Sequence, residues 1–241
     1  MSFLGKVVQW FLNPAHWHGD FGIPNRVEEH VVMSLAATGA ALLIALPVGL
    51  ALGHFGRGGA LAINISNVGR ALPSFAILVI AVQLVGIGPK PAFLALVALA
   101  IPPIMTNSFV GMRDVSPELR DAARGLGMSD LRVLLRVELP NALPVVMAGV
   151  RTAGVQVVAT ATLAALVGWG GLGRFIIDGF SQLDYVQVFA GALLVVVLSA
   201  AAELALALLQ WTLTPAGIRS AAAADRGRAV RATAPVAEPA T

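Results

Sequence analysis

The chain has 241 residues, of which 57% are hydrophobic and only 12% are charged. Because an average soluble domain carries about twice that share of charge, the composition disfavours a cytosolic enzyme. It predicts an all-α, polytopic membrane protein whose many small residues suit close helix packing in lipid. Cysteine is absent, which excludes disulfides, thiol catalysis and cysteine-bound metals. The net charge of +3 does not indicate a nucleic-acid partner, because no soluble basic face is visible.

The N-terminal segment, residues 1–30, is predicted to lie at the membrane surface on the extracytoplasmic side. Residues 1–12 have apolar side chains at helical spacing, but the run is too short to span a bilayer. A polar, turn-rich stretch follows. His16 and His18 could bind a metal in principle, but loop side chains beside an interfacial tryptophan are the simpler interpretation, and we expect no metal site.

Each predicted span is tested against the need for about 20 apolar residues. Five stretches meet it within a transmembrane domain at 31–213: 31–53, 60–88, 91–112, 141–167 and 186–213. Pro73 interrupts the second stretch, and if it splits that stretch into two crossings the five-helix core becomes six. Residues 214–241 lack periodicity and are predicted to be a disordered cytoplasmic tail.

Sidedness follows from the basic residues. Placing residues 113–140 in the cytoplasm leaves ten arginines on that side and four basic residues on the other. This bias favours an N-terminus outside and a C-terminus inside. The chain is therefore expected in the cell (inner) membrane.

The charged segment 116–140 predicts a helix–turn–helix on the inner surface. Ser116 can cap a first helix, which the glycines at 125 and 127 end. Ser129 can cap a second helix, and Pro140 is expected to close the segment where the fourth span begins. The alternative is a generic amphipathic loop.

The residues of this segment resemble a known motif. Its seven matching positions are Asp121, Ala122, Ala123, Gly127, Val137, Leu139 and Pro140. Their spacing resembles the EAA loop of ABC importer permeases, Glu-Ala-Ala-x3-Gly-x9-Ile-x-Leu-Pro, with Asp for Glu and Val for Ile. The run from Leu139 to Gly173 is most similar to osmoprotectant permeases of the methionine-permease-like fold, which carry glycine betaine, carnitine, choline and proline betaine.

The resemblance implies one permease subunit of a binding-protein-dependent importer. Its EAA loop would form the coupling helix that docks on a separate ABC ATPase subunit, with Asp121, Ala122, Ala123 and Gly127 as docking residues and Leu139-Pro140 completing the motif. An extracytoplasmic solute-binding protein and a second permease subunit, the same chain or a sister, would be the other partners. The chain itself would be no enzyme and would hold no cofactor, because ATP would bind to the separate subunit.

Two other interpretations stay open: a permease for another small polar solute such as an amino acid, and an ion-driven carrier. The sequence contains no phosphate-binding G-x-x-x-x-G-K-[ST] motif. The glycines at 168, 170 and 173 match a dinucleotide fingerprint in spacing. No strand–helix unit surrounds them, so a bend after the fourth span is the better interpretation.

Polar residues inside the spans are candidates for the translocation path. Thr152, Gln156 and Thr160 are spaced four apart and so share one helix face, which is either the pathway wall or a hydrogen-bonded helix contact. Gly168, Gly170 and Gly171 are candidates at the end of the same span. Glu203 lies within the fifth span, and either Arg151 or Arg70 could neutralise it. The alternative is that both arginines extend to the inner interface.

Overall fold

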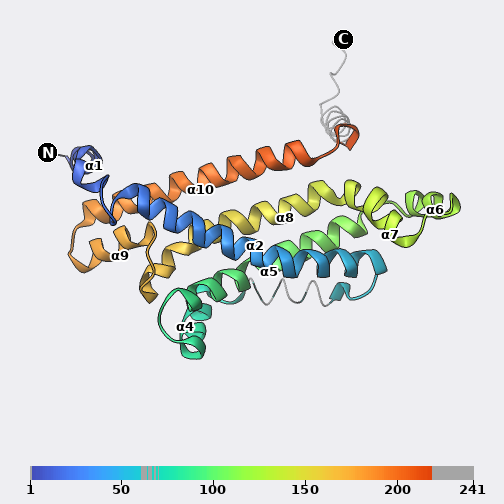
Figure 1. Ribbon diagram of the computed structural model, residues 1–241, viewed down its shortest axis with the longest axis horizontal. Coiled ribbons are helices and arrows are strands. Elements are labelled where there is room, and N and C mark those ends of the chain that lie inside the picture. The colour runs from blue at the N-terminus through green and yellow to red at the C-terminus, as the bar shows by residue number, and fades with distance from the viewer. Residues whose placement is uncertain (1, 61–63, 65–66, 68, 70, 219–241) are drawn as a thin grey trace, which may run out of the picture.

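The computed structural model describes residues 2–60, 64, 67, 69 and 71–218, and these are helical with no strand (Figure 1). The prediction of an all-α fold is therefore confirmed. In chain order the elements are α1 Phe3–Leu12, a 3-10 turn Pro14–His16, α2 Ile23–Phe55, α4 Ser74–Val85, α5 Pro89–Arg113, α6 Pro117–Gly125, α7 Asp130–Val133, a π-helix Leu134–Glu138, α8 Leu139–Thr160, a 3-10 helix Ala161–Val167, α9 Gly173–Ser181 and α10 Tyr185–Leu213.

Within the described residues, four helices are long and apolar enough to cross a membrane: Ile23–Phe55, Pro89–Arg113, Asp130–Val167 and Tyr185–Leu213. They match four of the five predicted spans. The fifth, 60–88, lies partly outside the described residues. Its second half is the shorter apolar helix α4, which begins immediately after Pro73, where the sequence predicts an interruption. Arg70 and residues 219–241 of the predicted tail also lie outside the described residues.

The helices give the molecule two distinct ends (Figure 1). Helices α6 and α7 lie at one end, and α1 and α9 lie at the other. The described part of the chain therefore begins with α1 at one end of the molecule, and its last long helix, α10, finishes at the other end.

The first long helix begins earlier than the sequence predicts. We expected a span at 31–53, yet α2 runs from Ile23 to Phe55. The polar residues just before position 31 obscured its start. In the structure their side chains have partners within the protein: Glu29 pairs with Arg26, and His30 hydrogen-bonds to the Val158 carbonyl. Polar side chains satisfied in this way can lie on a membrane-spanning helix.

The expected helix end at Pro140 is also wrong. The chain is continuously helical from Asp130 to Val167, so the second helix of the charged segment runs directly into the fourth span. A proline usually breaks a helix because it lacks a backbone N–H. Here it follows a π-turn, in which the Leu139 N–H bonds to the Leu134 carbonyl. The hydrogen-bond register changes at this point, so the missing donor is tolerated in the first turn of α8.

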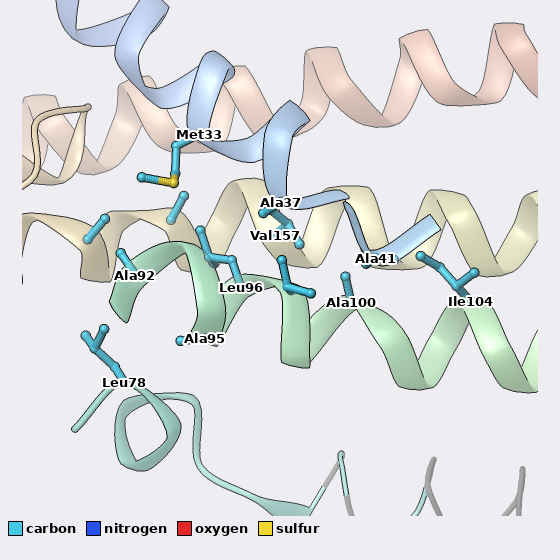
Figure 2. Packing of buried hydrophobic residues seen from close by; sticks show 14 of the residues in the cluster. Met33, Ala37, Ala41, Leu78, Ala92, Ala95, Leu96, Ala100, Ile104 and Val157 are labelled. Carbon is cyan, nitrogen blue, oxygen red and sulfur yellow. The ribbon is translucent and has the colours of Figure 1, made fainter. Parts of the chain in front are cut away.

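The core is the packing of α2, α5 and α8 through small side chains (Figure 2). Ala37 and Ala41 of α2 and Ala100 of α5 are fully buried, and Val157 of α8, also fully buried, belongs to the same cluster. Small residues let helix backbones approach closely, which is the main source of packing energy in lipid. Gly49 shows the same closeness: a Cβ there would lie 2.7 Å from the Met105 carbonyl oxygen.

This contact gives a matched pair of substitutions on α2. Gly49→Ala should lower the free energy of unfolding by about 1–3 kcal/mol, because the methyl group would collide with the α5 backbone. Gly39→Ala has no atom within 4 Å of its new Cβ, so it should be neutral or stabilising by up to about 1 kcal/mol. The measurement is the thermal midpoint of the detergent-solubilised protein by size-exclusion chromatography. Equal midpoints for the two variants would contradict close α2–α5 packing.

Candidate functional site

The segment that resembles a coupling loop folds as the predicted helix–turn–helix. The Ser116 hydroxyl accepts a hydrogen bond from the Leu119 N–H at 3.3 Å and caps α6. The backbone N–H of Glu118 and, to a lesser extent, the Ser116 hydroxyl hold the pKa of the Glu118 carboxyl below its usual value, so the start of α6 carries a negative charge. After α6 the chain turns at Gly127, whose φ of 77° is the left-handed region that favours glycine.

The motif residues divide into two groups. Asp121, Ala122 and Gly127 are exposed at the end of the molecule. Ala123 is 5% exposed and packs inward. Leu139 and Pro140 are partly buried in the first turn of α8, behind the surface that the exposed group forms. Of the four residues predicted to dock, Asp121, Ala122 and Gly127 are exposed and Ala123 is not.

A buried charge next to this loop was missed by the sequence reasoning. The Glu138 side chain has no exposed surface and lies between the His54 ring and the Arg120 guanidinium, 2.5 Å and 2.8 Å away. Its local signal is weak: an acidic residue inside an apolar stripe, two positions before Pro140. The partners lie 84 and 18 positions away in sequence, and nothing local pairs them.

The charges inside the spans meet between α8 and α10. Arg151 Nη2 forms an ion pair with Glu203, and its Nη1 donates to Gln210 at 3.1 Å. The pairing of Arg151 with Glu203 is therefore as hypothesised. The pair borders an open groove of about 490 Å³, lined by Ala148, Arg151, Thr152, Val155, Gln156, Glu203 and Gln210.

The three polar residues proposed as one face do not share one environment. Thr152 and Gln156 line the α8–α10 groove. Thr160 borders a small space of about 10 Å³ against Ser74 and Leu78 of α4. The Thr152 hydroxyl bonds back to the Ala148 carbonyl in its own helix at 2.9 Å, so it forms no cross-helix hydrogen bond there.

At the opposite end, the glycine cluster forms the predicted bend. Gly168 and Gly171 have φ of 83° and 81°, which turns the chain from the 3-10 helix into α9. The Gly171 N–H donates to Glu29 Oε2 at 2.7 Å. A Cβ at Gly170 would lie 2.0 Å from that same carboxylate oxygen. Gly168 and Gly171 are therefore favoured by their left-handed backbone, and Gly170 by the Glu29 carboxylate that lies against it.

His30 strengthens this contact from the same helix. Its Nε2 donates to the Val158 carbonyl at 2.8 Å, and its Nδ1 accepts from the Leu172 N–H at 3.3 Å. One neutral imidazole thus joins α2, α8 and the start of α9.

In the parts of the chain that the structure describes, no group of three His, Cys, Asp or Glu side chains could hold a metal ion. His16 stacks on Trp10, with ring centroids 4.1 Å apart.

Comparison with known families decides the class of the protein. The family model for "Binding-protein-dependent transport system inner membrane component" matches residues 41–213. The chain belongs to this family. The matched range contains the whole helix–turn–helix and the spans on either side of it, and the protein is therefore a multi-pass inner-membrane permease of the ABC transporter class.

Several named permeases are similar to this chain over most of its length. The carnitine transport permease protein OpuCB of Listeria monocytogenes is 37% identical over 193 residues, covering 80% of this chain and 88% of the relative. The choline transport system permease protein OpuBB of Bacillus subtilis is 37% identical over 191 residues, covering 79% and 88%. The osmoprotectant import permease protein OsmW of Salmonella typhimurium is 33% identical over 196 residues, covering 79% and 91%.

A solved structure supports the fold. The permease has a TM-score of 0.66 to a chain of the MetNI methionine ABC transporter, crystallised in inward-facing conformations. The two are 23% identical, and the match covers 78% of this chain and 94% of the other. The expected methionine-permease-like fold is therefore confirmed.

The Arg151–Glu203 pair can be tested with a double-mutant cycle. Arg151→Gln and Glu203→Gln should each destabilise the protein more than the double variant, because a single change leaves an unpaired charge within a span. We expect an interaction energy of roughly 1–2 kcal/mol from thermal midpoints in lipid nanodiscs. The control is the same cycle at Arg174 and Asp178, a pair within α9 at 2.7 Å. Additive effects at positions 151 and 203 would show that the pair is not energetically coupled.

Proposed function

We propose that this permease carries an osmoprotectant of the betaine or quaternary-ammonium class into the cell. The observation that carries the proposal is the similarity, over four-fifths of the chain, to permeases named for carnitine and choline. An extracytoplasmic binding protein would select the solute and deliver it to the α9 end. The chain itself performs no chemistry and offers only a path.

A separate binding protein fits the small number of aromatic rings that border the spaces among the described helices. Quaternary ammonium groups are usually held among several aromatic rings. Near the glycine bend, Trp169 borders an apolar space of about 430 Å³ in which Phe93 is the other ring. Two rings on an open surface suit transient passage, so we assign selection to the separate protein.

The proposed site of energy input is α6. Asp121 and Ala122 on α6 and Gly127 just after it are exposed, and Leu126 is 84% exposed. The first three are positions of the motif that resembles an EAA loop, and they are the part of it that faces outward. We infer that an ABC ATPase subunit covers it, that ATP binds to that subunit, and that α6 moves with it as a rigid body.

The proposed path lies along the α8–α10 groove. Both members of the Arg151–Glu203 pair are more than a third exposed, at 37% and 40% of their side chains. Charges with that exposure within a span do not face lipid; they face water or protein. We infer that a second permease subunit covers this face, and that Thr152 and Gln156 line the path between the two. Thr160 and the glycines at 168, 170 and 171 would border its α9 end.

Uptake by proteoliposomes tests the substrate class and the energy source together. The chain is reconstituted with its ATPase and binding protein, and radiolabelled glycine betaine, choline, carnitine and methionine are compared. We expect uptake of at least one quaternary-ammonium solute that requires ATP and persists with an ionophore. Uptake of methionine alone would indicate an amino-acid permease. Uptake that needs an ion gradient and no ATP would indicate an ion-driven carrier.

Docking of α6 has its own test. Asp121→Lys should weaken association with the ATPase roughly tenfold, or about 1.4 kcal/mol, because it reverses a charge at the proposed interface. Asp130→Lys is the matched control, since Asp130 is an exposed acid of α7 whose pair with Arg124 is 3.5 Å long. Association is measured by titrating the ATPase onto permease in nanodiscs. Similar weakening by both variants would indicate a general charge effect.

A further inference from the structure

A single buried carboxylate joins the proposed coupling helix to the spans. Glu138 has no exposed side-chain surface, and each of its oxygens lies within 2.8 Å of a nitrogen from another element. The contact to His54 is a hydrogen bond, whereas the contact to Arg120 is a close ion pair without hydrogen-bond geometry. His54, in the last turn of α2, donates to Oε2 at 2.5 Å. Arg120, in the middle of α6, pairs with Oε1 at 2.8 Å.

Arg120 also reaches α5, because its Nη2 donates to the Met112 carbonyl. Its side chain is 12% exposed, although it projects from a helix whose other charged residues face solvent. The one buried residue of α6 is Ala123, which has little surface with which to hold the helix. Arg120 therefore links α6 directly to the end of α5 and to Glu138, and through Glu138 to His54 at the end of α2.

The backbone around Glu138 is adapted to this contact. Leu134–Glu138 is a π-helix, with one residue more per turn than the helices on either side. In continuous α-helix geometry each residue turns by about 100°, so removing the extra residue would rotate Glu138 by that angle relative to α8. Single π-turns inside helices are frequent at functional sites. The insertion aims the carboxylate at His54 and Arg120.

We propose that Glu138, Arg120 and His54 form an ionic clamp that transmits movement of α6 to α2 and α8. Charges removed from water hold their partners strongly, because separating them would leave an unpaired charge in the interior. A displacement of α6 by a partner therefore displaces the α2 and α8 ends with it. All three are positioning residues, and none is part of the exposed docking surface. The inference rests on the proposed docking of α6 on an ATPase.

The first experiment tests the clamp without any partner. The chain has no cysteine, so the substitutions Leu126→Cys and Leu208→Cys introduce its only two thiols for spin labelling. The two positions are 84% and 65% exposed. The full chain in nanodiscs should give one narrow distance distribution between α6 and α10. Adding Glu138→Gln should broaden it. Arg124→Gln, which removes an exposed charge of the same helix, should leave it narrow.

The second experiment tests transmission in the complex with the ATPase and the binding protein. Glu138→Gln should leave ATPase association unchanged and lower binding-protein-stimulated ATP hydrolysis roughly tenfold, the size expected when coupling between two sites is lost. Arg120→Gln should behave likewise, and it decides the question if Glu138→Gln does not fold. Arg120→Lys keeps a cation beside Glu138 and should restore much of the stimulation.

The outcomes separate the clamp from the docking. An unchanged distance distribution in Glu138→Gln would overturn the clamp whatever the partner is. So would a broadened distribution with normal stimulation, or loss of ATPase binding in Arg120→Gln, since the three residues would then serve only rigidity or docking. If Asp121→Lys leaves ATPase binding intact, the proposed docking fails while the spin-label result on the clamp still stands.

Discussion

Every polar group inside a membrane-spanning protein has to find its partner within the protein, because lipid offers none. In this permease, several of these polar contacts lie along the continuous helix Asp130–Val167, which we call the rod. Glu138 meets α2 and α6 near its beginning, Arg151 meets α10 near its middle, and the Val158 carbonyl receives His30 of α2 near its end. The small side chains of the core bring the helices close, and these polar contacts fix which positions face one another.

The same contacts make α2 and the rod a single mechanical unit. At the α6 end they are joined by the hydrogen bond from His54 to Glu138, and at the α9 end by the hydrogen bond from His30 to the Val158 carbonyl. Two helices joined at both ends do not slide past each other without breaking these hydrogen bonds, so movement imposed at one end reaches the other. An importer has to open one side as it closes the other, and a unit of this kind suits that task.

Sequence reasoning located the elements whose signal is local. The lengths of the apolar runs predicted the spans, and Ser116 and Gly127 predicted the two ends of a short helix because caps and left-handed turns depend on neighbouring residues. It misplaced the start of α2 and the effect of Pro140, since both depend on pairings or on a helix register that local patterns do not reveal. The Glu138 cluster was missed for the same reason: its members lie on three elements that only the fold brings together.

The structure also divides the EAA-like motif by physical role. Gly127 is required by its left-handed backbone and Ala123 by its buried packing, so both would be needed even in a loop that met no partner. Asp121 and Ala122 have no such structural demand, because their side chains are exposed. The spacing of the motif residues is therefore the spacing of a helix–turn–helix that continues into a span. The surface proposed to contact the ATPase is limited to the motif residues that remain exposed. In the proposed arrangement the exposed positions contact the ATPase, while Arg120, next to Asp121 in sequence but largely buried, holds the loop against the ends of the spans.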